Sequence, residues 1–387
     1  MRTLKVSRAT AGFIARGHPW VRPDRFTVGL DALSAGEAVT LVDERGVALA
    51  AALADPQAEV CARVYARRPD AAFAPAAAYA AAWERRAGLH VDPDTDCYRV
   101  VHGEADGLPG LRVERYADVL VVLVLADCAS PSVEAVCAAA QRLLPRARIV
   151  VRDHRVDLRV SDVATRLHGG AEVDAEAMVI GREFGLRYPV RPFAGLATGL
   201  YVDQRATRRW LRARCGGARI LNLFAYTGAF SLALLTAGAA QATDVDLSAP
   251  ALARGREAAD LNAVGARYHQ EHADCLDWLA TCEAVFDIII SDPPTAAQGG
   301  GGWIARRDYP RLMSAILPRL APNGWLIAAS NTIGGKPLDL DEMARDASSA
   351  TKVALRDERG PDLDGDIPQI PGFPEGRPFR LAVRRRG

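Results

Sequence analysis

The second half of the chain alternates short apolar runs with helix-length segments, and this alternation limits the fold more than any other feature. From about Arg191 the apolar runs are RILNLFA, AQATDVD, VFDIIISD and GWLIAAS. Parallel strands buried on both faces read as continuous apolar runs, and a crossover segment must separate each from the next. The pattern therefore predicts an α/β domain built on a doubly wound sheet.

The preceding half predicts two smaller domains. A chain of 387 residues exceeds the roughly 250–300 residues at which single cores stop growing. We expect a small β-rich domain over residues 1–70, a linker helix and a small α+β domain over 71–190, and the doubly wound domain over 191–387. The predicted elements are two strands within Val39–Leu53, a helix over Ala71–Leu89, a hairpin turning at Asp106–Gly110, and a helix over Ser132–Leu144.

Charge and cysteine content exclude several kinds of protein. The chain has 48 Lys+Arg against 47 Asp+Glu, a net charge of +1, so any nucleic-acid contact must come from local patches. Seven scattered cysteines show neither CxxC nor Cys/His spacing, which predicts reduced thiols and no metal site. No apolar run approaches the roughly 20 residues that span a bilayer, and no leader is evident. We expect a soluble cytoplasmic protein without a membrane partner.

The first strand-to-helix junction of the third domain reads Asn222-Leu-Phe-Ala-Tyr-Thr-Gly-Ala-Phe230. Ligands of doubly wound sheets bind beyond the carboxyl ends of the strands, and Gly228 would let the backbone approach one closely. A dinucleotide site needs GxGxxG, of which only one glycine is present. The junction therefore favours a ligand without phosphates.

Two acidic residues follow the next two strands. Asp246 ends the second strand, 18 residues after Gly228, where a carboxylate can accept both hydroxyls of an adenosine ribose. Asp274 follows the third strand and could hold the adenine amino group, with Cys275 beside the ring. Either aspartate could instead cap the helix that begins after it, since Asp is common at such positions.

The sequence Ser291-Asp292-Pro293-Pro294-Thr295 directly follows the apolar run FDIIIS. Two prolines fix the chain and remove backbone donors, which leaves carbonyl groups and the Asp292 carboxylate to accept hydrogens from a planar base. A simple turn is the alternative. The Asp-Pro-Pro segment directly follows a central buried strand, and this position favours a substrate site.

Several motifs together resemble one family. NLFAYTGAFS, DVD, DLNAVG, HADCLDWL, FDIIISDPPT and PEG occur in the order typical of bacterial 23S ribosomal RNA methyltransferases of the RlmI type. The resemblance covers nearly the whole chain, because it extends to Gly17–Val21, Glu104–Gly110 and Thr198–Arg205. It implies an N-terminal PUA domain, a central domain and a class I, Rossmann-like methyltransferase domain that uses S-adenosyl-L-methionine.

The resemblance also implies roles for individual residues. Phe224, Tyr226 and Gly228 would surround the methionine part of the cofactor. Asp246 would bind its ribose and Asp274 its adenine, while Asp292 would border the target base. The remaining residues assigned to the cofactor are neighbours of these: Asn222, Thr227, Cys275, Asp203 and Arg205.

One departure concerns the target atom. Relatives that methylate carbon 5 of cytosine carry a nucleophilic cysteine after the strand that follows Asp-Pro-Pro. Here that position reads Ala328-Ala-Ser330-Asn331-Thr, which is similar to RlmK-type enzymes that methylate a guanine ring nitrogen. Together with Asp292, Pro293 and Pro294, Ser330 and Asn331 are the predicted catalytic residues. A cytosine-C5 enzyme, and an RNA-binding protein with an inactive methyltransferase domain, remain as alternatives.

The predicted partner is 23S ribosomal RNA, and a homodimer is left open. We expect RNA phosphates to contact a helix with arginines on one face, the Arg306-Arg307 pair and the C-terminal arginines. Solvated charged faces are the alternative. His18 and Trp20 are expected to stabilise the first domain rather than bind RNA. The helix and C-terminal arginines are Arg205, Arg208, Arg209, Arg212, Arg214, Arg384, Arg385 and Arg386.

Overall fold

The computed structural model of the chain describes residues 1–155, 165–170, 174, 176–193, 198–297, 302–332 and 337–387. They form two compact units. The first contains Met1–Arg182, Val190–Thr198 and Asp364–Arg377, and the second contains Glu183–Pro189, Gly199–Leu363 and Pro378–Gly387. The glycine-rich stretch predicted at Gln298–Gly302 lies outside the described residues except for Gly302.

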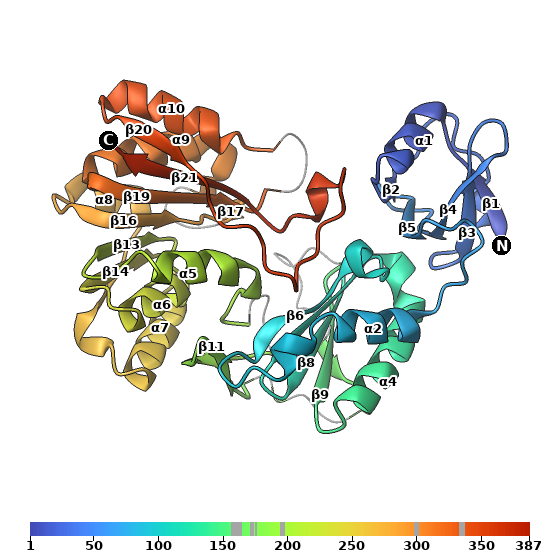
Figure 1. Ribbon diagram of the computed structural model, residues 1–387, viewed down its shortest axis with the longest axis horizontal. Coiled ribbons are helices and arrows are strands. Elements are labelled where there is room, and N and C mark those ends of the chain that lie inside the picture. Colours follow the sequence, from blue (N-terminus) through green and yellow to red (C-terminus); the bar gives the residue numbers. More distant parts are fainter. Residues whose placement is uncertain (156–164, 171–173, 175, 194–197, 298–301, 333–336) are drawn as a thin grey trace. The chain divides into compact units, whose positions relative to one another are not determined.

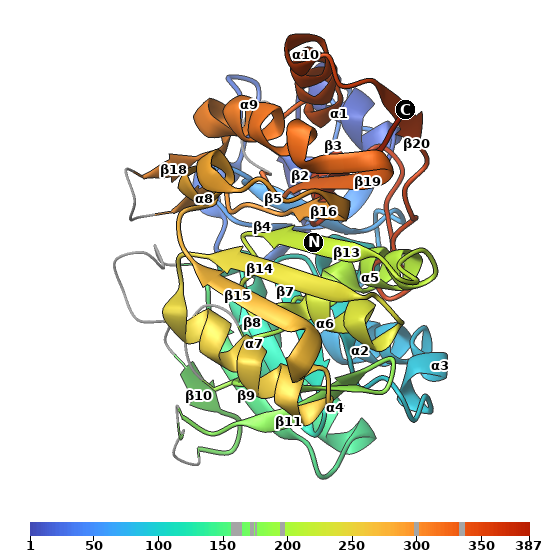
Figure 2. The ribbon, with the colours of Figure 1, turned by 90° about the vertical axis from the view of Figure 1, so that its left-hand side faces the viewer.

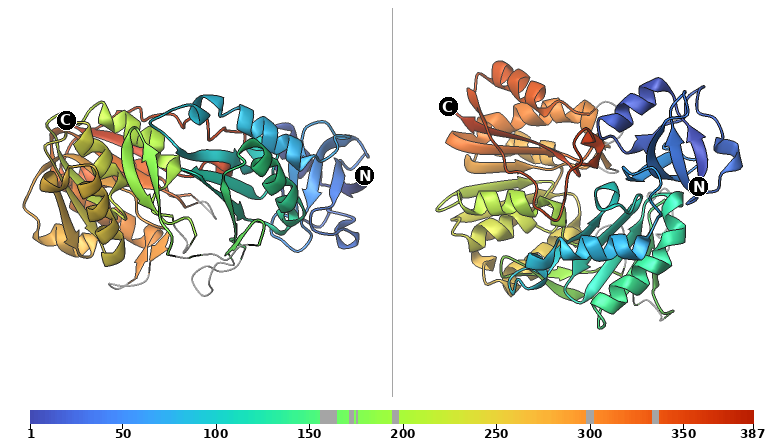
Figure 3. Two further views of the ribbon diagram at one scale, coloured as in Figure 1. Left: turned by 90° about the horizontal axis from the view of Figure 1, so that it is seen from below. Right: turned by 45° about the vertical axis from the view of Figure 1, so that its right-hand side comes forward.

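The first sheet of the first unit comes from the N-terminal residues and has the strand order β1-β3-β4-β5-β2. The two strands predicted within Val39–Leu53 are confirmed as the antiparallel pair β3 and β4. Helix α1 (Arg8–Ala15) contacts β4, and Figure 3 shows it beside the dark blue strands. The strands are β1 (Arg2–Lys5), β2 (Trp20–Val21), β3 (Ala38–Val42), β4 (Ala48–Ala54) and β5 (Ala62–Ala66).

A second five-stranded sheet follows in the order β10-β9-β8-β7-β6. The predicted hairpin is confirmed as the antiparallel pair β6 and β7, and the predicted helix over Ser132–Leu144 is α4 (Val133–Leu143). Helices α2 (Pro75–Glu84) and α4 supply the apolar core of this sheet. The strands are β6 (Cys97–His102), β7 (Leu111–Tyr116), β8 (Val119–Val124), β9 (Arg148–Asp153) and β10 (Thr165–Leu167).

The helix predicted over Ala71–Leu89 is shorter than expected. It begins at Pro75, which fits the first turn, and α2 ends at Glu84 before the short helix α3 (Ala87–His90). Between them the Arg86 guanidinium turns inward and forms a buried ion pair with Asp106. Arg86 has φ −101° and ψ 14°, outside the α-helical region, so α2 does not continue into α3.

The second unit contains a seven-stranded sheet in the order β15-β14-β13-β16-β19-β21-β20. Strands β15, β14, β13, β16 and β19 pair in parallel and β21 is antiparallel to β19, which confirms the predicted doubly wound sheet. Figure 2 shows the parallel strands side by side. They are β13 (Arg219–Leu223), β14 (Gln241–Asp246), β15 (Tyr268–His272), β16 (Phe286–Ser291), β19 (Leu320–Ser330), β20 (Leu355–Glu358) and β21 (Arg380–Arg386).

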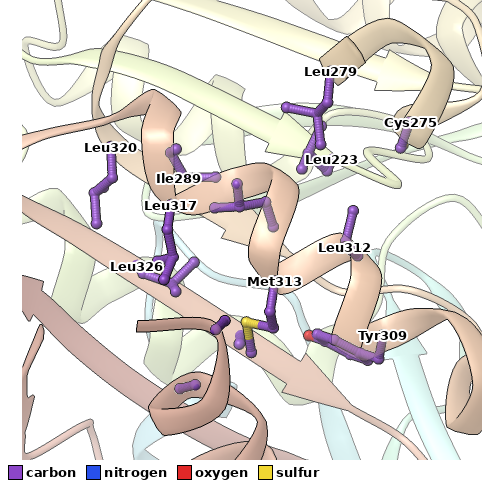
Figure 4. Packing of buried hydrophobic residues seen from close by; sticks show 14 of the residues in the cluster. Leu223, Cys275, Leu279, Ile289, Tyr309, Leu312, Met313, Leu317, Leu320 and Leu326 are labelled. Carbon is purple, nitrogen blue, oxygen red and sulfur yellow. The ribbon is translucent and has the colours of Figure 1, made fainter. Parts of the chain in front are cut away.

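Helices cover both faces of this sheet (Figure 1). Helices α5 (Arg205–Arg212), α6 (Ala229–Thr236) and α7 (Ala249–Leu261) lie on one face, and α8 (Cys275–Thr281), α9 (Ala305–Ile316) and α10 (Leu340–Thr351) lie on the other. Figure 4 shows Tyr309, Met313 and Leu317 of the α9 region packed toward the strands. No helix in the described part of the chain is long and apolar enough to cross a membrane.

Short elements complete the two units. Strands β11 (Val179–Glu183) and β12 (Leu186–Val190) pair with each other, as do β17 (Ala296–Ala297) and β18 (Trp303–Ile304). The 3-10 turns are η1 (Leu30–Ala32), η2 (Gly103–Asp106), η3 (Asp127–Ser132), η4 (Val202–Gln204), η5 (Gly265–Arg267), η6 (Leu317–Arg319) and η7 (Pro374–Gly376).

Candidate cofactor and substrate site

The carboxyl ends of β13, β14, β16 and β19 meet at one edge of the large sheet. In the strand register Leu223 lies opposite Val245 on one side and Ser291 on the other, and Ser291 lies opposite Ala328. The chain order reverses between β13 and β16, which is where ligands of doubly wound sheets bind. The predicted residues after β13, β14 and β16 are therefore brought together at this edge.

The turn after β13 has an uncommon backbone conformation. Phe224 and Tyr226 are not glycines, yet both have positive φ, 55° and 52°. The amide of Tyr226 donates to Oδ2 of Asp246, 2.7 Å away, which holds the turn against the end of β14. Non-glycine residues in this region of backbone space cluster at ligand sites, where surrounding contacts must hold them. The hydrogen bond to Asp246 thus supports an uncommon backbone conformation in the turn.

Gly228 and Asn222 serve the buried part of the same turn. A Cβ at Gly228 would lie 2.3 Å from Oδ2 of Asp244 and 2.3 Å from the Tyr268 hydroxyl, so side chains occupy the space that the glycine leaves. The Asn222 amide donates to Oδ1 of Asp244 at 3.0 Å and is itself buried. Burial raises the pKa of Asp244 to about 7. Gly228 and Asn222 therefore pack against the buried Asp244 side chain on the inner side of the turn.

The carboxylate of Asp246 retains room for ligand. One oxygen accepts the Tyr226 amide and the other accepts the Ser248 amide at 2.7 Å. Each carboxylate oxygen has two lone pairs, so each can accept one more hydrogen. The helix cap itself is Ser248, whose side chain accepts from Ala251. These contacts fit a carboxylate that orders its own turn and can still accept two ribose hydroxyls.

Asp274 does cap α8, as the alternative interpretation had it. The amides of Leu276 and Asp277 both donate to its Oδ1 atom, at 2.8 and 3.2 Å. Among the described hydrogen bonds, Oδ2 is left as the acceptor that an adenine amino group would use. The cap and the ligand role are therefore compatible, because they use different oxygens.

Cys275 and Thr227 lie below the surface of the site. The Cys275 thiol is 2% exposed, accepts from the Phe224 amide at 3.4 Å and has its pKa raised by burial. The Thr227 hydroxyl donates to the Gly199 carbonyl at 2.6 Å. That bond joins the cofactor turn to the Gly199–Arg205 segment, which contains the predicted residues Asp203 and Arg205. Arg205 is buried and Asp203 partly buried.

The Asp-Pro-Pro segment is held by an indole. The Trp303 Nε1 atom donates to the Pro294 carbonyl at 2.7 Å, and the Trp303 ring lies 4.8 Å from that of Phe224. The indole engages one lone pair of the Pro294 carbonyl, and the second lone pair can accept a further hydrogen. The orientation of the motif's acceptors toward a base stays a prediction.

Asp292 lies next to a residue that the sequence did not single out. Gln204 donates through Nε2 to Oδ2 of Asp292 at 3.1 Å and is 3% exposed. Burial and, to a smaller extent, the Asp203 charge raise the pKa of Asp292 to about 7. The only signal in the sequence was position, since Gln204 stands between the two residues Asp203 and Arg205 that the family resemblance implied.

Ser330 and Asn331 end β19 beside this segment. The Ser330 hydroxyl is buried and bonds with the Thr332 hydroxyl at 3.1 Å. The Asn331 side chain is exposed, and its Oδ1 accepts from the Thr295 hydroxyl at 3.0 Å. Asn331 thus joins the end of β19 to the residue that follows Asp-Pro-Pro. Their catalytic role stays a prediction.

The expectation of an exposed arginine face on α5 is wrong for Arg205 and Arg208. Arg205 and Arg208 are buried, and Arg208 forms a bidentate ion pair with Glu183. Arg384 is also buried and pairs with Asp341 and Asp357. The helical spacing was correct, but it does not say which face of a helix is covered. Five further predicted side chains have protein partners, because Arg212, Arg214, Arg385 and Arg386 donate to carbonyl groups and Arg307 pairs with Asp308. Contact of these arginines with RNA phosphates stays a prediction.

His18 and Trp20 contact residues outside the first sheet, and their expected role in stabilising the first domain stays a prediction. The Trp20 indole donates to Glu104 at 2.8 Å, and its ring lies 4.9 Å from that of Phe373. His18 bonds with Glu375 at 3.2 Å. Both side chains therefore link the first sheet to other parts of its own unit.

Comparison with known proteins decides the family. Residues 126–371 match the family described as S-adenosylmethionine-dependent methyltransferase, and residues 4–67 match a PUA-like domain. The chain belongs to the S-adenosylmethionine-dependent methyltransferases. This methyltransferase uses S-adenosylmethionine, and the acceptors left on Asp246 and Asp274 suit that cofactor's ribose and adenine. Among the described residues no cluster of His, Cys, Asp or Glu could hold a metal ion.

Curated relatives narrow the family. The chain is 35% identical over 353 residues to a protein named ribosomal RNA large subunit methyltransferase from Deinococcus radiodurans, covering 84% of each chain. It is 32% identical over 346 residues to ribosomal RNA large subunit methyltransferase I of Escherichia coli O139:H28, covering 84% of this chain and 85% of that one. The methyltransferase is thus a member of the ribosomal RNA large subunit methyltransferase family.

Solved structures share the fold along the whole chain. A putative methyltransferase complexed with SAH superimposes with a TM-score of 0.85 and 21% identity, covering 100% of both chains. A putative SAM-dependent methyltransferase from Streptococcus mutans gives a TM-score of 0.84 at 20% identity, again over 100% of both. The arrangement of a PUA-like domain before a class I methyltransferase domain is therefore shared with these proteins.

Proposed function

We propose that this methyltransferase modifies a ring nitrogen of a purine in the large-subunit (23S) ribosomal RNA. The names of its relatives support the choice of RNA. The end of β19 supports the choice of atom, because Ser330 and Asn331 stand where a cytosine-C5 enzyme needs a nucleophilic cysteine. The PUA-like domain and the methyltransferase domain would both contact the RNA.

The cysteines elsewhere in the chain support a nitrogen target. Carbon-5 methylation needs a thiolate that adds to the cytosine ring. Burial raises the pKa of the thiols of Cys275, Cys215 and Cys128, which keeps them protonated at neutral pH. Cys282 follows α8 rather than β19. A ring nitrogen needs no covalent intermediate, because the electron pair that becomes available when its proton leaves attacks the methyl group directly.

Asp292 supplies the chemistry that such a nitrogen requires. The cofactor, when bound, supplies an electrophilic methyl group on its sulfonium. The Asp292 carboxylate would accept the hydrogen bond of the ring N–H and take its proton as the new N–C bond forms. A carboxyl group with a pKa near 7 can hold and release that proton at neutral pH. Pro293 and Pro294 would fix the carboxylate in place.

Replacement of the carboxylate tests this role. Asp292→Asn should lower methyl transfer to protein-free large-subunit ribosomal RNA by about 100-fold or more, because the amide cannot take a proton. The matched control is Asp287→Asn at the other end of β16, where the side chain accepts the Arg219 amide. The control should keep wild-type activity, and thermal unfolding should show both variants folded.

The product identifies the atom. Nucleosides from the methylated RNA are separated and weighed by mass spectrometry. An N-methylated purine is expected, and 5-methylcytidine as the product would contradict the proposed atom. Absence of any methylated nucleoside with the wild-type protein would contradict the substrate.

A further inference from the structure

We propose that Gln204 is a positioning residue for methyl transfer: its Nε2 atom holds the Asp292 carboxylate ionised and oriented, and leaves the second carboxylate oxygen for the target N–H. The inference rests on the proposed function and adds to it a residue outside the Asp-Pro-Pro motif. Gln204 ends the turn η4, directly before α5.

While Asp292 is ionised, its contact with Gln204 has only one chemically sensible orientation. An ionised carboxylate only accepts hydrogen bonds, so the amide nitrogen rather than the amide oxygen must face Asp292. The donor–acceptor pair is Nε2 and Oδ2, 3.1 Å apart. A donated hydrogen favours the ionised form of the acid. Oδ1 of Asp292 then remains as the atom that faces substrate.

The other end of the Gln204 amide is unusual. Its Oε1 atom is buried and has no hydrogen-bond partner among the described residues, although the side chain is 3% exposed. Buried amide oxygens in folded proteins almost always have a partner, and exceptions often mark functional positions. Among the described residues, the bond to Asp292 is therefore the hydrogen bond that orients the Gln204 side-chain amide.

The charged surroundings show why a neutral donor stands here. Asp203, on the same turn, raises the pKa of Asp292, and Arg208 on α5 lowers it. Tyr309 of α9 donates to the Ala329 carbonyl at 2.9 Å, and its own pKa is raised by burial and by the Asp292 charge. A cation in place of Gln204 would stabilise the carboxylate so strongly that it could no longer take a proton near neutral pH. An amide orients it without that effect.

The decisive variant is Gln204→Met, which keeps length and removes the donor. Without the donated hydrogen, Asp292 should protonate at higher pH. Methyl transfer at about pH 6.5 should fall about tenfold, and at about pH 8.5 it should return to within about twofold of wild type. Gln204→Glu, which adds a third carboxylate, should move the pH profile further in the same direction.

The matched control is Gln141→Met. Gln141 is a partly buried glutamine of the first unit, and its side-chain amide donates to the Pro145 carbonyl at 2.7 Å. It should change stability without moving the pH profile. A purely structural role for Gln204 predicts the same behaviour as the control, so equal activity loss at both pH values in Gln204→Met would overturn the proposal.

A second readout does not depend on turnover. Carbon-13 NMR of the aspartate carboxyl groups, with Asp292 assigned by its loss in Asp292→Asn, follows the protonation of this group directly. Its midpoint should lie higher in Gln204→Met than in wild type, and an unchanged midpoint would overturn the inference. If instead the wild-type protein methylates no RNA, the proposed function fails while the NMR result still reports on the contact.

Discussion

Asp244 is a buried carboxyl group whose hydrogen-bond partners, among the described residues, are all neutral. It is 0% exposed and accepts hydrogens from Asn222, Ser231 and Tyr268, all of which are neutral. Neutral donors compensate only part of the cost of burying a charge, and burial raises the pKa of Asp244 to about 7. Because these partners also support the cofactor turn, the protonation of one residue is coupled to the shape of the site.

The consequence is a stability that depends on pH. The folded-state pKa of about 7 lies above the ordinary aspartate value of 3.8, so between these two values the folded state binds more protons than the unfolded chain. Stability should therefore fall as pH rises through this range. Asp244→Asn removes the titrating group, so its melting temperature should decline less than that of wild type between about pH 5 and about pH 7.5.

Asp292 titrates in the same direction, so the informative quantity is the difference between the two proteins. The control is Asp346→Asn on α10, which is exposed. It should follow wild type at both pH values. The same decline in Asp244→Asn as in wild type would show that Asp244 is not the group responsible.

Sequence alone could identify residues whose role follows from position along a strand. Asp246, Asp274 and Asp292 each follow a predicted strand, and parallel strands bring such positions to one edge. The Gln204 contact joins residues 88 positions apart, and no periodicity encodes it. Burial of Arg208 was missed for a related reason, because its partner Glu183 lies in β11, 25 positions earlier.

The buried ion pair of Arg208 determines how α5 meets its neighbours. The guanidinium donates to both oxygens of Glu183 at 2.6 Å and to the Tyr201 carbonyl at 2.9 Å. The same group lies over the Phe230 ring, 5.7 Å from its centroid. One side chain therefore holds β11, α6 and the Gly199–Arg205 segment to α5.

Loss of one partner of the Arg208–Glu183 pair should lower the free energy of unfolding strongly, whereas replacement of both partners by apolar residues should not. Arg208→Met leaves the Glu183 carboxylate buried and unpaired, which should lower the free energy of unfolding by about 3–5 kcal/mol. The double variant Arg208→Met with Glu183→Leu removes both charges and should recover most of that loss. Urea unfolding measures both. If the single and double variants are equally stable, the unpaired Glu183 carboxylate does not lower the free energy of unfolding, and the expectation is wrong.

The double variant separates stability from function. It still lacks the donor to the Tyr201 carbonyl, and Tyr201 is a 55% exposed ring that lies 5.5 Å from Tyr226 of the cofactor turn. We expect methyl transfer to stay reduced although the fold is restored. Strands such as β13 and β16 could be predicted from the sequence because apolar runs define them. The contacts of Arg208 with β11, α6 and the Gly199–Arg205 segment could not be predicted, because they join different elements.

The whole chain is organised by one long return to its first unit. After Leu363 the chain leaves the second unit, contributes residues 364–377 to the first, and comes back at Pro378 to form β21. Asp366 accepts the Arg99 amide at 3.0 Å, and the Gly376 carbonyl accepts from His102 at 2.7 Å. Burial lowers the pKa of His102 to about 3, so its ring is neutral and donates one hydrogen. We predicted from the sequence that residues 364–377 belong to the third domain, 191–387. The predicted domain boundaries at 70 and 190 stay predictions.

Two glycines make this return fit. Gly372 has φ +80°, and a Cβ there would lie 2.4 Å from the Arg16 carbonyl oxygen; a Cβ at Gly17 would lie 2.1 Å from that of Pro371. Gly372→Ala should therefore displace the segment and destabilise the first unit by about 1–3 kcal/mol. Limited proteolysis followed by mass spectrometry should show faster cleavage within residues 364–377.

Gly365→Ala is the matched control, because nothing lies within 4 Å of its added methyl group and its φ is not positive. It should be cleaved like wild type, since an alanine in an open position adds no clash. The difference matters for the whole molecule because β21, which completes the large sheet beside β19, follows the return directly. If both glycine variants are cleaved at the wild-type rate, the contacts of residues 364–377 do not hold the segment, and β21 must be positioned by its pairing with β19 alone.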